Sequence, residues 1–262
     1  MGIVNVTPDS FSDGGKFYSL ESSYKHSVQL LKDGADILDI GGESSRPGAK
    51  PISVKEEMDR VLPLISKVSL NFPQAIISID TTKAQVAEEA IKAGAKIVND
   101  ISGLANDKDM PNIVSNYGVP VVIMHMQGKP ETMQNKPFYT DLINEIKSFF
   151  RERIQYVGRF GIVKEQIILD PGIGFGKTLK HNLTLISKIS LFHSLGFPIL
   201  IGSSRKKFIN QIAGKFDSKE RIGGTLASVL YLLSQGIQIF RVHNVNEVKQ
   251  GILVFKKILL EK

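Results

Sequence analysis

The chain has 262 residues, of which 42% are hydrophobic and 23% charged, with a formal net charge of +7 and no cysteine. This composition is typical of a globular protein with a full core, and the lack of cysteine excludes disulfides and thiolate metal sites. No apolar run approaches the roughly 18 residues that cross a bilayer, and the basic residues form no stripe with aromatic ones. We therefore expect a cytoplasmic protein that binds neither a membrane nor nucleic acid. A solvated surface explains the positive charge, and a small phosphorylated ligand is the alternative.

Eight short runs rich in β-branched residues alternate along the chain with segments of helical spacing. The predicted strands span residues 2–6, 36–40, 75–80, 96–99, 120–125, 166–170, 198–202 and 238–242. Helical spacing is clear at 56–70, 83–94 and 143–161, and Gly94 and Gly161 stand where helix C-caps belong. Eight strand–helix units in about 250 residues, with no linker between them, predict a single-domain (β/α)8 TIM barrel over residues 1–262. The alternative is an open, doubly wound sheet.

Almost every predicted strand ends in a polar residue. These residues are Asn5, Asp39, Asp80, Asn99, His125, Asp170, Ser203, and Arg241 with His243. The parallel strands of a barrel place their carboxyl ends at one rim, where the active sites of this fold lie. The polar residues are therefore predicted to converge on one mouth, which favours the barrel over the open sheet.

The segment DPGIGFGKT, from Asp170 to Thr178, resembles two phosphate-binding loops but matches neither. The Walker loop requires a glycine where Pro171 stands, and the dinucleotide fingerprint requires one where Lys177 stands. We therefore interpret Asp170 as a ligand-binding side chain, followed by glycines that let the backbone approach the ligand.

Asp80, Asn99 and Asp170 together suit a flat heterocycle that carries N–H donors. A carboxylate accepts two parallel hydrogen bonds from an amidine-like edge, and an amide supplies one further acceptor. Metal binding by the paired carboxylates is the first alternative, and capping of helix N-termini is the second.

Two later segments carry the opposite charge. The segment GSSRKKF, residues 202–208, places two serines at the expected start of a helix, with Arg205 and Lys206 just inside it. A helix N-terminus beside a lysine favours anions. Arg241 and His243 are two residues apart, so their side chains leave the last strand on the same face. At a barrel mouth this pair indicates a diphosphate site, although a single histidine is more often structural.

Two loops over this mouth are longer than an ordinary strand–helix turn. They span residues 7–17 and 41–51, and both are rich in glycine, serine, proline and aspartate. We expect them to act as lids that become ordered around the ligands.

Taken together, eight segments of this sequence resemble the dihydropteroate synthases, a family of pterin-binding enzymes and the target of sulfonamides. The segments are MGIVNVTPDSFSDGG, DIGGESSRPGA, SID, VNDISG, MHMQG, DPGIGFGK, SSRKKF and RVHNV. They occur in the family's order from Gly2 to about Val245. The resemblance implies a transferase of folate biosynthesis that is a homodimer. In its reaction, the amine of 4-aminobenzoate displaces diphosphate from (7,8-dihydropterin-6-yl)methyl diphosphate to give 7,8-dihydropteroate, with loss of diphosphate preceding amine attack.

The resemblance also assigns residues to each part of the site. The pterin diphosphate would contact Ser45, Asp80, Asn99, Asp170, Lys206, Arg241, Val242 and His243. The 4-aminobenzoate side would contain Phe11, Ser45, Arg46, Pro47 and Ser204. The residues implied in catalysis are Asp13, Asp80, Lys206, Arg241 and His243, and Asn5 would bind Mg²⁺, which is the expected cofactor.

The sequence departs from the family pattern in three places. Ser45 stands where threonine is usual, so we expect looser packing around aminobenzoate, and Asn244 stands where aspartate is common. The chain also starts at the first strand, without an earlier segment that often closes the barrel floor, which we expect to lower stability. Two alternative functions fit part of the pattern: a pterin-binding methyltransferase barrel, and a pterin-binding domain without catalysis.

Overall fold

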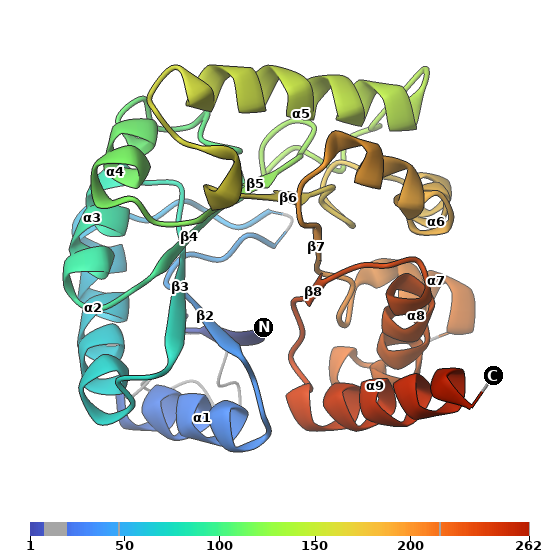
Figure 1. Cartoon of the computed structure of the whole chain (residues 1–262), viewed down its shortest axis with the longest axis horizontal. Helices are drawn as coiled ribbons and strands as arrows, with labels where there is room; N and C mark the ends of the chain where they lie inside the picture. Colours follow the sequence, from blue (N-terminus) through green and yellow to red (C-terminus); the bar gives the residue numbers. More distant parts are fainter. Residues whose placement is uncertain (8–19, 47, 215, 262) are drawn as a thin grey trace.

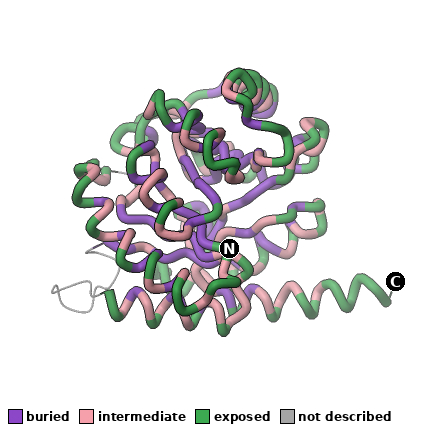
Figure 2. The backbone as a smooth tube through the Cα atoms, turned by 60° about the vertical axis from the view of Figure 1, so that its left-hand side comes forward, coloured by how far each residue is buried: buried purple, intermediate pink, exposed green. Residues whose placement is uncertain are grey.

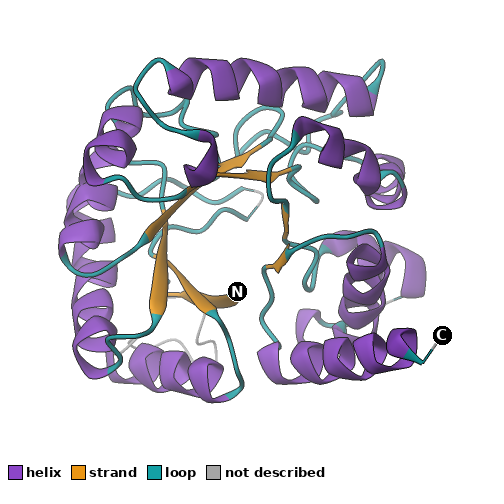
Figure 3. Ribbon diagram, in the orientation of Figure 1, coloured by secondary structure: helices purple, strands orange, loops and turns teal. Residues whose placement is uncertain are grey.

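The structure, a computed structural model, describes residues 1–7, 20–46, 48–214 and 216–261. Parallel strands form a ring that helices surround on the outside (Figure 1, Figure 3). Its strands are β1 (Gly2–Asn5), β2 (Ile37–Gly41), β3 (Ile76–Asp80), β4 (Ile97–Asp100), β5 (Val121–Met124), β6 (Ile167–Asp170), β7 (Leu200–Ile201) and β8 (Ile239–Phe240). Its α-helices are α1 (Leu20–Lys32), α2 (Val54–Asn71), α3 (Ala84–Lys92), α4 (Met110–Tyr117), α5 (Leu142–Gly158), α6 (Leu179–Ser187), α7 (Lys207–Ala213), α8 (Ile222–Ser234) and α9 (Val245–Leu260).

Backbone hydrogen bonds join the strands in sequence order and close the ring. The first six strands form one parallel sheet, and β7 pairs with β8. The Leu169 N–H donates to Pro198 at 2.9 Å, which joins β6 to the residues before β7. Beyond β8, the Ile3 N–H donates to the Val242 carbonyl at 3.0 Å, which joins β8 to β1. The predicted (β/α)8 barrel is therefore confirmed, and the open-sheet alternative is wrong.

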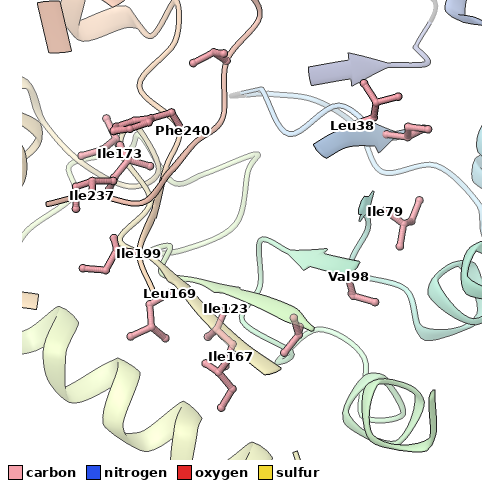
Figure 4. Close-up of a cluster of buried hydrophobic side chains, with 14 of the residues drawn as sticks. Leu38, Ile79, Val98, Ile123, Ile167, Leu169, Ile173, Ile199, Ile237 and Phe240 are labelled. Atoms are coloured by element: carbon pink, nitrogen blue, oxygen red, sulfur yellow. The ribbon is translucent and has the colours of Figure 1, made fainter. Parts of the chain in front are cut away.

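Alternation along each strand divides the apolar residues into two layers. Side chains on the outer face of the strands pack against the helices, and Leu38, Ile79, Val98, Ile123 and Leu169 lie in this layer (Figure 4). A smaller cluster fills the inside of the barrel near the amino ends of the strands, formed by Ile97, Val122 and Leu200 with Met1, Ile37, Ile168 and Ile239. Burial is greatest along the strands, and the outer faces of the helices are exposed (Figure 2).

Glycine predicted the C-terminal end of one helix correctly and that of another three residues too late. Gly94 directly follows Ala93, the C-cap of α3, and adopts φ +117°, as its predicted capping role requires. By contrast, α5 ends at Gly158, three residues before Gly161, which was the predicted cap. In the part of the chain that the structure describes, no helix combines the length and the apolarity needed to cross a membrane.

Candidate active site at the carboxyl ends of the strands

On four of the strands, the inner face of the barrel changes from apolar to polar over two residues. Ile37, Ile97, Ile168 and Ile239 point inward near the amino ends of β2, β4, β6 and β8. Since side chains two residues apart share a face, the next inward positions on these strands are Asp39, Asn99, Asp170 and Arg241. The strand pattern itself thus places a polar layer above an apolar floor.

Arg241 links two carboxylates across this polar layer. Its Nε donates to Asp39 Oδ2 at 2.5 Å, and its Nη2 donates to Asp80 Oδ2 at 2.7 Å. The same Asp39 oxygen accepts from Asn99 Nδ2 at 3.1 Å. Residues from β2, β3 and β4 and from the end of β8 therefore form one hydrogen-bonded group. This confirms that Asp80, Asn99 and Arg241 lie together.

Asp80 and Asp170, two carboxylates of this layer, are difficult to ionise. Burial raises the pKa of Asp80 to about 7 against the opposing attraction of Arg241, and the charge of Asp39 adds to the increase. Burial also raises the pKa of Asp170 to about 6, although a hydrogen bond from Gly172 and the charge of Lys206 act to lower it. For Arg241, burial acts to lower the pKa, but Asp39 and Asp80 outweigh it and the pKa is raised. Perturbed groups gathered in this way are typical of a binding or catalytic site.

Lys206 reaches the same layer from the loop after β7. Its Nζ lies 4.1 Å from the centre of the Phe175 ring. Burial lowers its pKa to about 8; Arg241 adds to that effect, and Asp170 and Asp80 oppose it. The predicted helix start was wrong: α7 begins at Lys207, Lys206 is its N-cap, and Arg205 has φ +58°, outside helical geometry. Lys206 therefore stands at the entrance of the helix rather than within its first turn.

The glycines after Asp170 allow the loop to cross the end of β5 at close range. Gly172 adopts φ +71°, and a Cβ there would lie 2.0 Å from the carbonyl oxygen of His125. Gly176 adopts φ +60°, and a Cβ there would lie 2.4 Å from the carbonyl oxygen of Gln127. The Gly172 N–H in turn donates to Asp170 Oδ1 at 2.7 Å and orients that carboxylate.

Lys177, two residues before the start of α6, makes contacts within the protein that do not fit a phosphate-binding lysine. Its Nζ lies 2.9 Å from the Phe175 carbonyl oxygen and 3.0 Å from His125 Nδ1, and Lys177 is buried. Burial lowers the pKa of Lys177 to about 7 and that of His125 to about 2, so the neutral imidazole accepts from the ammonium. The pair fixes the loop against β5, and His125, which we placed in the polar ring, serves this contact.

His243 and Ser204 form a hydrogen-bonded pair after β8 and β7. The Ser204 hydroxyl accepts from the His243 backbone N–H at 3.2 Å and lies 3.0 Å from His243 Nδ1. When the hydroxyl donates to Nδ1, the imidazole carries its proton on Nε2, which has no partner among the described residues and can donate to a ligand. Burial, followed by the charges of Arg205 and Arg241, lowers the pKa of His243 to about 3, so the ring is neutral without an anion beside it.

Asn244 contacts Arg205 rather than the centre of the site. Its Oδ1 accepts from Arg205 Nη2 at 2.7 Å and from Arg205 Nε at 3.0 Å. The amide therefore supplies a neutral acceptor at the position where the family commonly has a carboxylate.

A partly buried cluster of charged side chains anchors the base of the second long loop. Lys83 Nζ donates to Glu43 at 2.6 Å and also to Glu57 on α2. Glu43 accepts in addition from the Ile52 N–H at 2.9 Å, which ties the two ends of the loop together. Between these ends, Ser45 is half-buried and Arg46 is exposed.

Some residues expected at the site lie elsewhere or outside the described residues. Phe11, Asp13 and Pro47 lie outside the described residues. The Val242 side chain packs in the outer core, and its backbone N–H and carbonyl close the barrel. Ser203 bonds to Ser228 at 2.8 Å and is buried, so it belongs to the packing of α8. Asp39 had no predicted role beyond its place at a strand end.

Known proteins resemble this chain over most of its length. The model of the pterin binding enzyme family matches residues 1–243. A dihydropteroate synthase from Synechocystis sp. is 46% identical over 252 residues, which are 95% of this chain and 86% of the relative.

Two solved structures share the fold. The Yersinia pestis dihydropteroate synthase in a sulfonamide drug complex has a TM-score of 0.93 and 41% identity, with 98% of this chain and 92% of that chain covered. The Xanthomonas albilineans enzyme in complex with 7,8-dihydropteroate has a TM-score of 0.89 and 36% identity, with the same coverage of both chains. The chain therefore belongs to the pterin-binding enzyme family and, within it, to the dihydropteroate synthases.

Proposed function

We propose that this chain condenses (7,8-dihydropterin-6-yl)methyl diphosphate with 4-aminobenzoate at the carboxyl ends of its strands, giving 7,8-dihydropteroate and diphosphate. The observation that carries the residue assignment is the grouping of Asp80, Asn99, Asp170 and Arg241 in one polar layer with Lys206 beside it. The family assignment supports the reaction, and the geometry supports the position of each substrate.

The pterin ring lies across the polar layer in this proposal. Asp170 accepts from the 2-amino group and the ring N3–H, since its carboxylate has one oxygen already held by the Gly172 N–H and remains able to accept further bonds. Lys206 donates to the 4-oxo and N5 side, and Asn99 and Asp80 complete the polar contacts. N–H donors of the ring would stabilise the ionised carboxylates, whose pKa values burial has raised.

The diphosphate lies at the corner formed by Arg241 and His243. In the absence of an anion, two carboxylates occupy Arg241 on one side, and His243 is neutral. An arriving diphosphate supplies negative charge that favours protonated His243, so binding is expected to take up a proton.

The expected Mg²⁺ fits a site that the substrate completes. The described residues contain no cluster of three or more histidine, aspartate or glutamate side chains that could hold a metal. Mg²⁺ commonly retains its waters and binds through one or two protein oxygens together with substrate phosphates. Asn5, half-buried at the end of β1, would supply such an oxygen. When bound, Mg²⁺ would neutralise part of the diphosphate charge.

The chain's own residues accelerate departure of the diphosphate rather than attack by the amine. The described part of the site presents no activated nucleophile, and an aniline nitrogen needs little activation. Arg241 and His243 stabilise the charge that develops on the leaving oxygens. Asp80 and Asp170 face the cation that remains on the pterin, and their negative charge stabilises it. The 4-aminobenzoate, bound beside Ser45, Arg46 and Ser204, then attacks the cationic methylene carbon through its amine nitrogen. The new C–N bond replaces the broken C–O bond, and the amine loses one proton to solvent.

A diphosphate-release assay tests the function. Purified protein with pterin diphosphate, 4-aminobenzoate and Mg²⁺ should release diphosphate and form dihydropteroate in equal amounts. Omitting 4-aminobenzoate should prevent formation of dihydropteroate. A protein that binds pterin but releases no diphosphate would support the non-catalytic alternative, and methyl transfer to a corrinoid would support the methyltransferase alternative.

We further propose a homodimer located in the cytoplasm. Support for the dimer comes from α9, whose end extends away from the barrel (Figure 2). This helix also exposes large apolar side chains. Leu253, Val254, Ile258 and Leu260 are each more than half exposed, and a second subunit would cover them. Light scattering should give twice the mass of the 28.9 kDa chain, and Leu253→Glu should shift the mass toward one chain.

A further inference from the structure

A buried carboxylate within the polar layer holds two of the proposed ligand-binding residues. Asp39 lies in the middle of β2, and its side chain is 0% exposed, so it does not contact a ligand in the mouth. Its Oδ2 accepts from both Arg241 Nε and Asn99 Nδ2. Its Oδ1 has no hydrogen-bond partner among the described residues. Because a buried, partly unsatisfied carboxylate destabilises the fold, packing alone does not account for it.

The bond between Asp39 and Asn99 fixes the direction of the Asn99 amide. The amide nitrogen donates to Asp39, so the amide oxygen is left on the opposite side of the group. Turning the amide over would place its oxygen against the Asp39 carboxylate, where two acceptors repel each other. Asn99 therefore presents an acceptor to the mouth, which matches an N–H donor of a pterin ring.

The same Asp39 oxygen aims the guanidinium of Arg241. Nε is held by Asp39 and Nη2 by Asp80, so two of the three guanidinium nitrogens are fixed by carboxylates. The third, Nη1, has no acceptor among the described residues. A planar guanidinium held at two nitrogens has no freedom to turn, so Nη1 keeps one direction for an incoming ligand.

We propose that Asp39 is a positioning residue, which sets the Asn99 amide and the Arg241 guanidinium in the orientations that recognise the pterin diphosphate. This proposal rests on the proposed function of the site, and it assigns Asp39 no contact with substrate. It explains why the barrel keeps a carboxylate at this depth.

Calorimetric titration with 6-hydroxymethylpterin tests the proposal. Asp39→Asn replaces a charged acceptor by a neutral one of the same shape, and a neutral hydrogen bond is about half as strong as a charged one. We expect pterin affinity to fall by about tenfold, the ratio that corresponds to 1.4 kcal/mol. The matched control is Asp59→Asn, which alters an exposed carboxylate on α2 and should leave the affinity unchanged.

The swapped variant separates positioning from packing. Asn99→Asp alone places two carboxylates in contact, and we expect it also to weaken pterin binding. Combining Asp39→Asn with Asn99→Asp restores one donor, one acceptor and one negative charge. The double variant should therefore bind at least about twofold more tightly than the sum of the two single losses predicts, since contacting residues couple by about 0.5 kcal/mol or more. If Asp39 only fills space, the two losses add and the double variant binds worst.

Three results would overturn the inference: unchanged affinity in Asp39→Asn, additive losses in the double variant, or a folded double variant that does not bind the pterin. If Asp39→Asn does not fold, the double variant alone is used for the test, because it keeps the donor, the acceptor and the negative charge of the original pair. Asp170→Asn, titrated in parallel, distinguishes failure of the proposed pterin site from failure of the proposed role of Asp39. Unchanged binding in Asp170→Asn would reject the proposed pterin site itself, whereas weakened binding there with unchanged binding in Asp39→Asn would reject only the role of Asp39.

Discussion

Asp170→Asn should stabilise the protein and weaken pterin binding at the same time. Asp170 is 6% exposed, and burial raises its pKa from 3.8 to about 6. A carboxyl whose pKa is higher in the folded chain than in the unfolded chain binds its proton more tightly when folded. Stability is therefore lost as the pH rises from about 4 through 6, and the full cost is present above pH 7. Asparagine has no such cost and retains an oxygen for the Gly172 N–H.

The size of the gain follows from the same pKa. A difference of about two pKa units corresponds to about 3 kcal/mol in the free energy of unfolding at pH 8. This value is an upper limit, because the Asp170 charge also favours the protonated forms of Lys206 and Lys177, which would lose that attraction. For a chain of this size, each kcal/mol changes the Tm by about 2 °C, so an increase of up to about 6 °C is expected.

Two measurements on one variant check this reasoning. Thermal unfolding at pH 8 should show the increase in Tm, and at pH 5 the increase should be about half as large. Calorimetry with 6-hydroxymethylpterin at pH 8 should show an affinity loss of about 10- to 100-fold, since a charged hydrogen bond contributes about 1.5–3 kcal/mol. An unchanged or lower Tm at pH 8 would refute the burial argument, and unchanged affinity would refute the ligand role.

Four further predictions follow from the same geometry. Lys206→Ala should weaken pterin binding by about 1.5–3 kcal/mol in calorimetry; a solvated lysine without a ligand role would give no change. Gly172→Ala should lower the free energy of unfolding by about 2–5 kcal/mol, because its Cβ would lie 2.0 Å from a carbonyl oxygen; urea unfolding with an unchanged midpoint contradicts this. Lys83→Met should lower the free energy of unfolding by about 3 kcal/mol, because it leaves the buried Glu57 unpaired. It should also raise the KM for 4-aminobenzoate, because the loop that carries Ser45 and Arg46 loses the bond between Lys83 and Glu43. Lys92→Met, in an exposed pair, should change neither quantity. Finally, 4-aminobenzoate should bind more tightly when diphosphate, Mg²⁺ and pterin are present, and reciprocally so; equal affinity by titration in both conditions would mean that its pocket is preformed.

The sequence pattern predicted the architecture because the signals that carry it are local. Each predicted strand is an apolar run bounded by turn residues, and all eight occur in the ring, although β7 and β8 are shorter than their runs. Several polar site residues were also predictable: each of Asp39, Asn99, Asp170 and Arg241 stands two positions after an inward isoleucine, so strand alternation alone puts its side chain inside the barrel. The glycines after Asp170 likewise indicated a loop in which the backbone adopts positive φ.

The pairing of these side chains depends on the closed barrel and not on any local pattern. Arg241 meets Asp39 across 202 residues and Asp80 across 161, and only the register of all eight strands brings them to one depth. For the same reason, the sequence predicted His125 and Ser203 at the site, whereas in the structure they form hydrogen bonds with Lys177 and Ser228, respectively. Alternation along a strand determines the face of the sheet to which a side chain points. The partner of that side chain is determined by the tertiary structure, because hydrogen bonds and ion pairs depend on distances that chain order does not specify.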